Sequence, residues 1–241
     1  MRGRFPFILR SIVIAVIIFS WIFFGWPQIF NFPPKIKEAK AAWGVPKVGA
    51  AVTALSGNVT LTEPAGVAQG DLMIAAIAYR SNATFTLPAS WALVATQQSS
   101  GDTDATNGIA SGLMAYIVRG ASAPDLVFTR TAGDQTIGRI ISYSGTNSTP
   151  YDTGSANTLG TASATVTTGT FTTAEAGELI VAMTSGGDAY TASAFDAATD
   201  PATASGATDT TTAPTEGTWL ERADSTYSGG ADGGLAMADA I

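Results

Sequence analysis

The feature that most limits the fold is a series of short apolar or alternating runs, each closed by Gly, Pro, Asn, Asp or Ser. Such runs predict β-strands, and no long segment of the body has a helical period. From residue 48 onward there are also 33 threonines, and β-branched side chains favour strands over helices. We therefore predict an all-β, antiparallel β-sandwich with strands at 48–55, 58–62, 72–80, 84–87, 91–97, 112–118, 126–131, 136–144, 161–173, 179–184, 218–223 and 234–241.

Three segments recur in the same order in the two halves of the body. GDLMIA at 70–75 resembles GELIVA at 177–182, SWALV at 90–94 resembles TWLE at 218–221, and GLMAY at 112–116 resembles GLAMA at 234–238. The offsets of 107, 128 and 122 residues differ, so the halves carry different loop insertions. This echo predicts one jelly-roll-like sandwich of two related halves, with 72–78 and 179–182 in equivalent central places. Two small independent domains are the alternative.

The N-terminal segment is apolar enough to enter a membrane. Residues 11–26 carry no charge, and residues 27–32 extend the stretch to about 22 residues, enough for a helix to span a bilayer. We predict a hydrophobic helix in 1–32, a Pro/Lys-rich linker at 33–47 and the body at 48–241. The helix is either a signal peptide, cleaved between Ala41 and Ala42, or an uncleaved anchor. If it is uncleaved, the membrane is a partner of the chain.

Charge separates the N-terminal segment from the body. Residues 1–47 hold seven basic residues against Glu38, a net charge of +6, whereas residues 48–241 hold five arginines against 18 acidic residues, a net charge of −13. An acidic body repels phosphate backbones, so we expect no nucleic-acid partner. The basic start before the apolar run favours an N-terminus inside and a body outside the membrane. We therefore expect an extracellular or cell-surface protein.

The chain contains no histidine and no cysteine. This excludes Ser-His-Asp triads, Cys-His nucleophiles, thiolate or imidazole zinc sites and iron–sulfur clusters, because each needs one of these side chains. We expect no catalytic residue, no metal site and no cofactor.

The last run, 234–241, stays apolar to the final residue, although its counterpart in the first half is followed by two further strands. We expect the sequence to be truncated at its C-terminus. The consequence would be an unpaired sheet edge, which favours association with other chains.

The order of these motifs resembles a β-sandwich module of secreted bacterial and phage-associated surface proteins. The residues that carry the resemblance are 70–79, Trp91 to Val94, 112–118, APDLVFT at 123–129 and ISYSG at 141–145 followed by Pro150. GWPQIF at 25–30 and PPKIKEA at 33–39 are similar to the leader and anchor segments of surface proteins from uncultured candidate-phylum bacteria. The resemblance implies a jelly-roll or concanavalin-like sandwich and an external location, and it implies no catalytic residue.

Aromatic side chains in turn-rich stretches are the candidate ligand contacts. Tyr151, Tyr190 and Tyr227 lie in or beside such stretches, and a flat apolar ring with a polar rim suits stacking on a sugar. Trp91 and Trp219 occupy equivalent positions before apolar strands in the two halves, which favours a place in the core.

Glutamates could supply the paired carboxylates of a glycoside hydrolase, which stand about 5 to 10 Å apart. Glu178 follows Gly177 as Asp71 follows Gly70, and this symmetry favours a structural role in a turn. The candidates are Glu175, Glu178, Glu216 and Glu221.

Three functions therefore compete. The sequence favours a non-catalytic structural or adhesion module at the cell surface, because apolar strands, Thr-rich faces and an anchor need no reactive residue. A carbohydrate-binding module is the alternative and requires an exposed aromatic platform. A glycoside hydrolase is the third, and a surface glycan or a protein is the expected partner in the first two cases.

We predict that the body is exported. A reporter that is active only outside the cytoplasm, fused after Ile241, should give signal in the membrane or medium fraction. Mass spectrometry of the mature N-terminus then separates release, with a start at Ala42, from anchoring, with a start at Met1. Reporter signal confined to the cytosol would contradict export.

Overall fold

Strand β4 (Leu72–Arg80) is the strand around which the fold is arranged. Its sequence, LMIAAIAYR, is apolar at nearly every position instead of alternating, which is typical of a strand covered on both faces. Residues 71–79 are all buried. The strand pairs antiparallel with β10 (Thr136–Tyr143) on one side and with β8 (Ala110–Val118) on the other.

The computed structural model describes residues 43–80, 84–94, 98–99, 110–131, 135–146, 149–152, 172, 177–186, 211–214, 218–227 and 233–241. All of them belong to the second of two units, 1–40 and 41–241, into which the chain divides. The predicted N-terminal helix and residues 33–42 of the predicted linker lie outside the described residues. Within the described part, no helix is long and apolar enough to cross a membrane.

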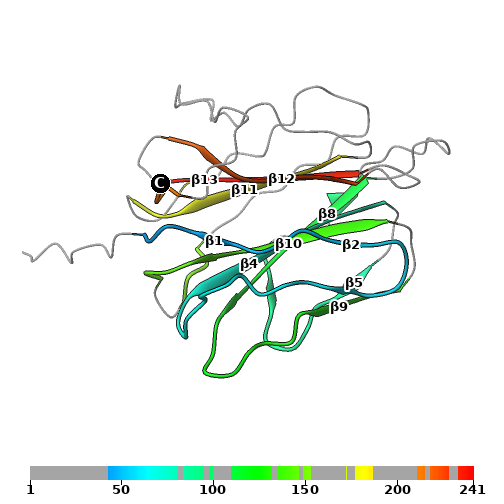
Figure 1. Ribbon diagram of the computed structural model, residues 1–241, viewed down its shortest axis with the longest axis horizontal. Coiled ribbons are helices and arrows are strands. Elements are labelled where there is room, and N and C mark those ends of the chain that lie inside the picture. Colours follow the sequence, from blue (N-terminus) through cyan, green and yellow to red (C-terminus); the bar gives the residue numbers. More distant parts are fainter. Residues whose placement is uncertain are drawn as a thin grey trace, which may run out of the picture. The chain divides into compact units, whose positions relative to one another are not determined.

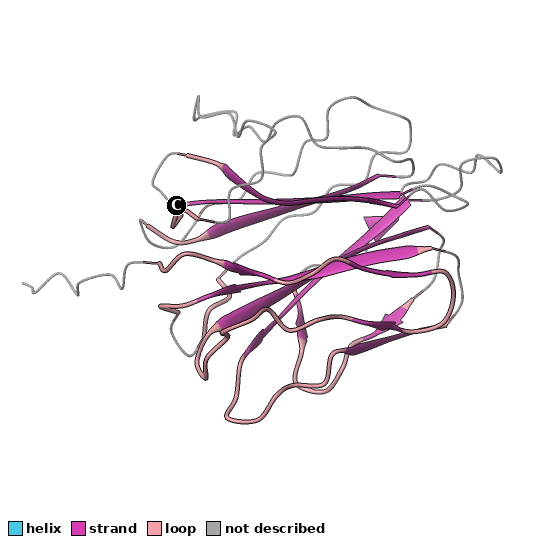
Figure 2. Cartoon of the chain, viewed as in Figure 1, coloured by secondary structure: helices cyan, strands magenta, loops and turns pink. Residues whose placement is uncertain are grey.

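The described residues form three antiparallel sheets and no helix, so the all-β, antiparallel class is confirmed (Figure 2). The largest has the order β1-β10-β4-β8-β6 (Figure 1). Both edges are interrupted: β1 and β2 pair with β10, and β6 and β7 pair with β8. The bounds of these edge strands are Lys47–Val48 for β1, Val52–Ala54 for β2, Ala92–Leu93 for β6 and Gln98–Ser99 for β7.

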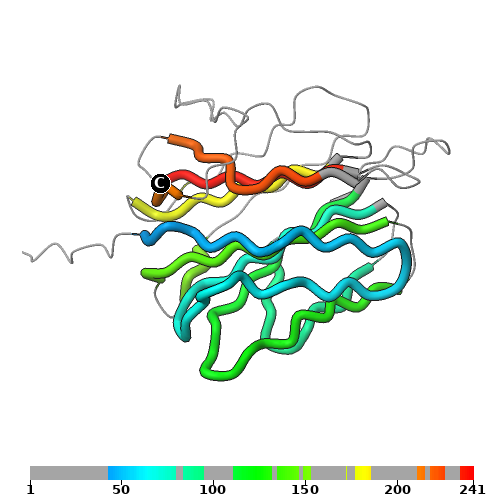
Figure 3. Tube along the Cα trace, viewed as in Figure 1, coloured from blue at the N-terminus to red at the C-terminus, as the bar shows by residue number. Residues whose placement is uncertain are grey.

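Two three-stranded sheets complete the structure. One has the order β3-β9-β5, with β3 at Val59–Thr60, β9 at Val127–Arg130 and β5 at Phe85–Thr86. The other has the order β11-β13-β12, with β11 at Ile180–Gly186, β13 at Gly233–Ala240 and β12 at Leu220–Tyr227; we call it the C-terminal sheet. Its yellow-to-red strands lie together in Figure 3, on one side of the blue-to-green strands.

The two faces of β4 belong to two separate cores. Met73, Ile77 and the other odd-numbered residues of the strand pack with side chains of the β3-β9-β5 layer, such as Phe128. Leu72, Ile74 and the other even-numbered residues pack with residues of the C-terminal sheet, which are Ala223, Leu235 and Met237. The first and second halves of the body therefore share a core.

The segments that recur in the two halves of the sequence also occupy equivalent places in the order of the strands. The repeated segments form β4, β6 and β8 in the first half and β11, β12 and β13 in the second, and β8 and β13 are the middle strands of equivalent trios. The register differs by one residue: the offsets place Leu179 opposite Ala240, but Ile180 is the partner. Because side chains alternate between faces, this shift turns β13 over relative to β8.

One prediction about these elements needs correction. The strand predicted at 179–182 is not in a central place: among the described strands β11 pairs only with β13, whereas β4 lies between two neighbours.

The described end of the predicted linker, residues 43–47, contacts the body. Trp43 contacts the Tyr143 ring edge-to-face at 6.5 Å, and Lys47 begins β1. Burying the apolar ring of Trp43 against the body is more favourable in free energy than leaving it in water.

Replacing Ile74 with Asp should lower the free energy of unfolding by about 3 kcal/mol or more, because the charge would be buried without a partner. Ile74 is 6% exposed and Leu55 is 63% exposed, so Leu55→Asp is the matched control and should change stability by about 0.5 kcal/mol or less. Chemical denaturation of the full-length chain measures both. Equal unfolding midpoints for the two variants would contradict this placement of β4.

Candidate functional site

The aromatic pair Tyr116–Tyr151 is the candidate ligand-contact surface. Tyr151 lies eight residues beyond the end of β10, and its ring stacks on that of Tyr116 in β8 with centroids 5.7 Å apart and an angle of 19°. The Tyr151 hydroxyl donates a hydrogen bond of 2.8 Å to the carbonyl oxygen of Val94. These two contacts fix the orientation of the Tyr151 ring, although the residue is 41% exposed. The pair therefore presents an aromatic ring that is fixed in orientation and partly exposed, which is the kind of surface that stacks on sugar rings.

Of the three predicted contact residues, the structure places Tyr151 in this pair. Tyr227 ends β12, where its backbone pairs with Gly233, but its side chain lies outside the described residues, as does the whole of Tyr190. Sequence reasoning missed Tyr116. The alternation of side chains between the two faces of β8 could have identified it. Tyr116 stands between the buried Ala115 and Ile117, so its side chain points to the opposite face.

The two tryptophans are part of the packing. Trp91 is 7% exposed, packs edge-to-face against Phe128 at 5.3 Å, and donates a hydrogen bond from Nε1 to the carbonyl oxygen of Asp125. Trp219 is partly buried against Ala236 and Ala238 of β13. The prediction that both belong to the core rather than to a binding surface is confirmed for Trp91, and Trp219 packs at the margin of a smaller cluster.

A fully buried charge cluster joins the C-terminal sheet to the large sheet. Arg222 of β12 donates from Nε to Asp239 Oδ2 at 2.6 Å and from Nη2 to Oδ1 at 2.7 Å, a bidentate pair. Tyr143 of β10 donates its hydroxyl to Asp239 Oδ2 at 2.8 Å. Burial, and then the Asp239 carboxylate, raise the pKa of Tyr143 well above its usual range, so the phenol keeps its proton. We call these three residues the inter-sheet clamp.

A β-bulge in β12 makes the inter-sheet clamp possible. The register shifts between Glu221 and Ala223, so Arg222 is an extra residue in the strand. Ala223 packs in the core shared with β4. The preceding residue, Arg222, donates hydrogen bonds to Asp239 and to the carbonyl oxygen of Thr212. Sequence reasoning missed this cluster, and its signal was weak: an arginine, Arg222, in the short segment 218–223 and an aspartate, Asp239, in the otherwise apolar segment 234–241.

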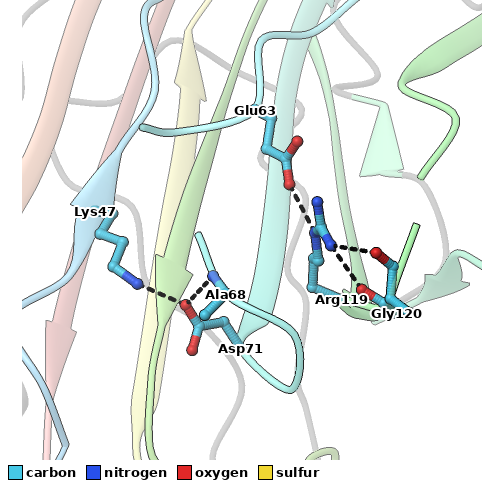
Figure 4. Close-up of polar contacts among 7 residues, drawn as sticks. Lys47, Glu63, Ala68, Asp71, Arg119 and Gly120 are labelled. Atoms are coloured by element: carbon cyan, nitrogen blue, oxygen red, sulfur yellow. Dashed lines mark hydrogen bonds and ion pairs between the residues drawn. The ribbon is translucent and has the colours of Figure 1, made fainter. Parts of the chain in front are cut away.

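Charge pairs also hold one end of the large sheet (Figure 4). Asp71, at the start of β4, accepts from Lys47 Nζ at 2.6 Å and from the backbone nitrogen of Ala68 at 2.9 Å. Arg119, just after β8, donates from Nε to Glu63 at 3.0 Å and from Nη1 to the carbonyl oxygen of Gly120. These bonds give Asp71 the structural turn role that its position predicts.

The glycines before the two equivalent strands share one backbone state. Gly70 has φ +90° and Gly177 has φ +77°, and both lie in the left-handed region that glycine adopts without strain. Each is followed by an acidic residue, Asp71 in the first half and Glu178 in the second. The symmetry seen in the sequence therefore corresponds to a shared turn conformation.

The two candidate hydrolytic glutamates that the structure describes are separated by a strand. Glu178 lies two residues before β11 and Glu221 lies in β12, and β13 runs between these two strands. Glu175 and Glu216 lie outside the described residues.

Glu221 has the most unusual environment of these glutamates. It is 2% exposed, and neither carboxylate oxygen has a hydrogen-bond partner among the described residues. Burial, and then the nearby Asp224 carboxylate, raise its pKa from 4.5 to about 7. Burial also raises the pKa of Asp224. No three acidic side chains gather as metal ligands in the part of the chain that the structure describes.

Comparison with known proteins finds no matching protein family, no matching curated protein and no similar solved structure. The resemblance to surface modules drawn from the sequence motifs therefore stays a prediction.

Replacing Asp239 with Asn should lower the free energy of unfolding by roughly 3–5 kcal/mol, because Arg222 would stay buried without its counter-charge. Glu63→Gln is the matched control: the Arg119–Glu63 side chains are 17% and 26% exposed, so its loss should cost about 1 kcal/mol or less. Urea titration of the two full-length variants compares them. If Asp239→Asn were as stable as Glu63→Gln, the inter-sheet clamp would not carry the packing of the C-terminal sheet.

Proposed function

We propose that this chain is a non-catalytic structural or adhesion module that is secreted or displayed at the cell surface. In this proposal the body is a jelly-roll-like β-sandwich, and the apolar N-terminal segment exports it as a signal peptide or holds it in the membrane as an anchor. The acidic body and the basic, apolar start support export, and the acidic surface argues against a nucleic-acid partner.

The observation that carries the structural role is the inter-sheet clamp. Arg222, Asp239 and Tyr143 are each fully buried: Arg222 and Asp239 pair within the C-terminal sheet, and the Tyr143 hydroxyl ties that pair to the large sheet through a charge-assisted bond. Buried ion pairs of this kind add little net stability compared with apolar packing, but they penalise every arrangement in which the partners separate. A module that must keep one shape while attached to a cell benefits from that penalty.

The test of the structural role is display of the full-length chain on cells. Cells that display it should attach to one another or to a surface under flow, and Asp239→Asn should weaken attachment at equal display because the sheets separate more easily. The Glu63→Gln variant should attach like the unmodified chain. Release of reducing ends from a polysaccharide by the purified chain would contradict the non-catalytic proposal.

Carbohydrate binding is the second candidate, and the Tyr116–Tyr151 pair favours it. The Tyr151 ring is held from below by Tyr116 and at its hydroxyl by Val94, so stacking on a ligand costs little further ordering. Its partial exposure leaves ring surface for a sugar. The ligand class is then a glycan with an apolar ring face.

Binding on a glycan array should weaken about tenfold when Tyr151 becomes Ala, which corresponds to about 1.4 kcal/mol of stacking. Tyr151→Phe keeps the ring and the stack on Tyr116 and loses only the bond to Val94, so it should retain most of the affinity. Unchanged binding in Tyr151→Ala, measured with the full-length chain, would remove this residue from the contact surface.

A further inference from the structure

The outer face of the C-terminal sheet contains a buried carboxyl group that nothing described so far uses. Glu221 stands opposite Ala238 in the β12–β13 register, on the face that carries the small cluster of Ala236, Ala238, Ala182 and Trp219. It is 2% exposed, and its two carboxylate oxygens have no hydrogen-bond donor among the described residues. An ionised carboxylate in such surroundings is strongly unfavourable unless it is paired.

The bulge places a second acid beside it. In a regular strand, residues three apart point to opposite faces, but the extra residue Arg222 brings Asp224 to the face of Glu221. Glu221 then faces Ala238 and Asp224 faces Ala236, two residues apart along β13. One oxygen of Asp224 also has no partner. Two acids this close repel each other when both are ionised.

The other charged groups around Glu221 do not compensate it. On β12 the neighbour is Asp224, and the only basic group that acts on this pair in the described part is Arg139 of β10, which interacts with Asp224. The neighbouring strand β13 contributes Ala238 to the cluster, and β11, on the far side of β13, contributes Ala182. Arg222 and Asp239 neutralise each other in the inter-sheet clamp.

We propose that Glu221 is a proton-operated latch on strand β12. With its proton, the side chain is a neutral group that the alanine-lined face accommodates, and β12 stays paired with β13. When the proton leaves to bulk water, the carboxylate has neither a donor nor a counter-charge among the described residues, and the bulged segment of β12 opens to hydrate it. The device would loosen the edge of the C-terminal sheet as the pH outside a cell rises, whether or not the module binds a glycan.

The direction in which stability changes with pH follows from the raised pKa of Glu221. Below pH 4.5 the folded and unfolded chains both hold the proton, and Glu221 adds no pH-dependent cost. Between pH 4.5 and about 7 the unfolded chain ionises first, so stability falls as pH rises. Above about pH 7 the folded chain carries the buried charge in full, and this is the range in which the latch opens.

Hydrogen exchange of the full-length chain, followed by mass spectrometry at pH 4.0 and pH 8.5, tests the latch. Comparing variants at the same pH removes the intrinsic pH dependence of exchange. At pH 8.5 the amides of 220–227 should exchange at least about tenfold faster in the unmodified chain than in Glu221→Gln. At pH 4.0 the two should agree, because Glu221 then holds its proton in both the closed and the open strand. The amides of β4 should exchange alike in both proteins.

Glu178→Gln is the matched control, since it removes a carboxylate that precedes β11 of the same sheet, and it should behave like the unmodified chain. Equal exchange in the unmodified chain and Glu221→Gln at pH 8.5, or the same slowing in Glu178→Gln, would overturn the proposal. Asp224→Asn provides an independent check that keeps Glu221. Removing the neighbouring charge should move the pH midpoint of β12 opening to a lower value, and an unmoved midpoint would also overturn the proposal.

Discussion

The burial of β4 on both faces is the constraint on which the rest of the structure depends. If only one face of the large sheet were covered, the apolar side chains on the other face of β4 would be exposed to water. The large sheet therefore needs a covering layer on each side. The β3-β9-β5 layer covers the odd-numbered residues of β4, and the C-terminal sheet covers the even-numbered ones. The second half of the body therefore supplies part of the core that buries β4 of the first half.

Close contact between these layers depends on two glycines. A Cβ on Gly138 of β10 would lie 2.6 Å from a methyl carbon of Leu61, and one on Gly112 of β8 would lie 3.0 Å from Ser185 Oγ and 3.1 Å from Met183 Cε in β11. Only glycine lets the sheets approach to this distance without moving backbone or side chains. One glycine serves the core on each side of the large sheet.

The polar groups between the sheets follow from the same geometry. Once the C-terminal sheet covers β4, any charge on its inner face is removed from water and must find its partner there. Arg222, Asp239 and Tyr143 satisfy one another, and the bulge that turns Arg222 inward also leaves Glu221 and Asp224 side by side on the outer face. One irregularity in β12 thus creates both a satisfied cluster and an unsatisfied one.

The sequence by itself determined the β class, the position of almost every described strand, the turn role of Asp71 and the burial of Trp91, because these depend on local alternation and on residues that are neighbours in the chain. Tertiary structure alone decided the one-residue change of register, the place of β11 at the edge of the described part of its sheet, and the pairing of Tyr116 with Tyr151. It also decided the inter-sheet clamp, which joins residues 96 positions apart. Such contacts depend on which layer covers which face, and the alternation of side chains within a strand is the same whichever partner it meets.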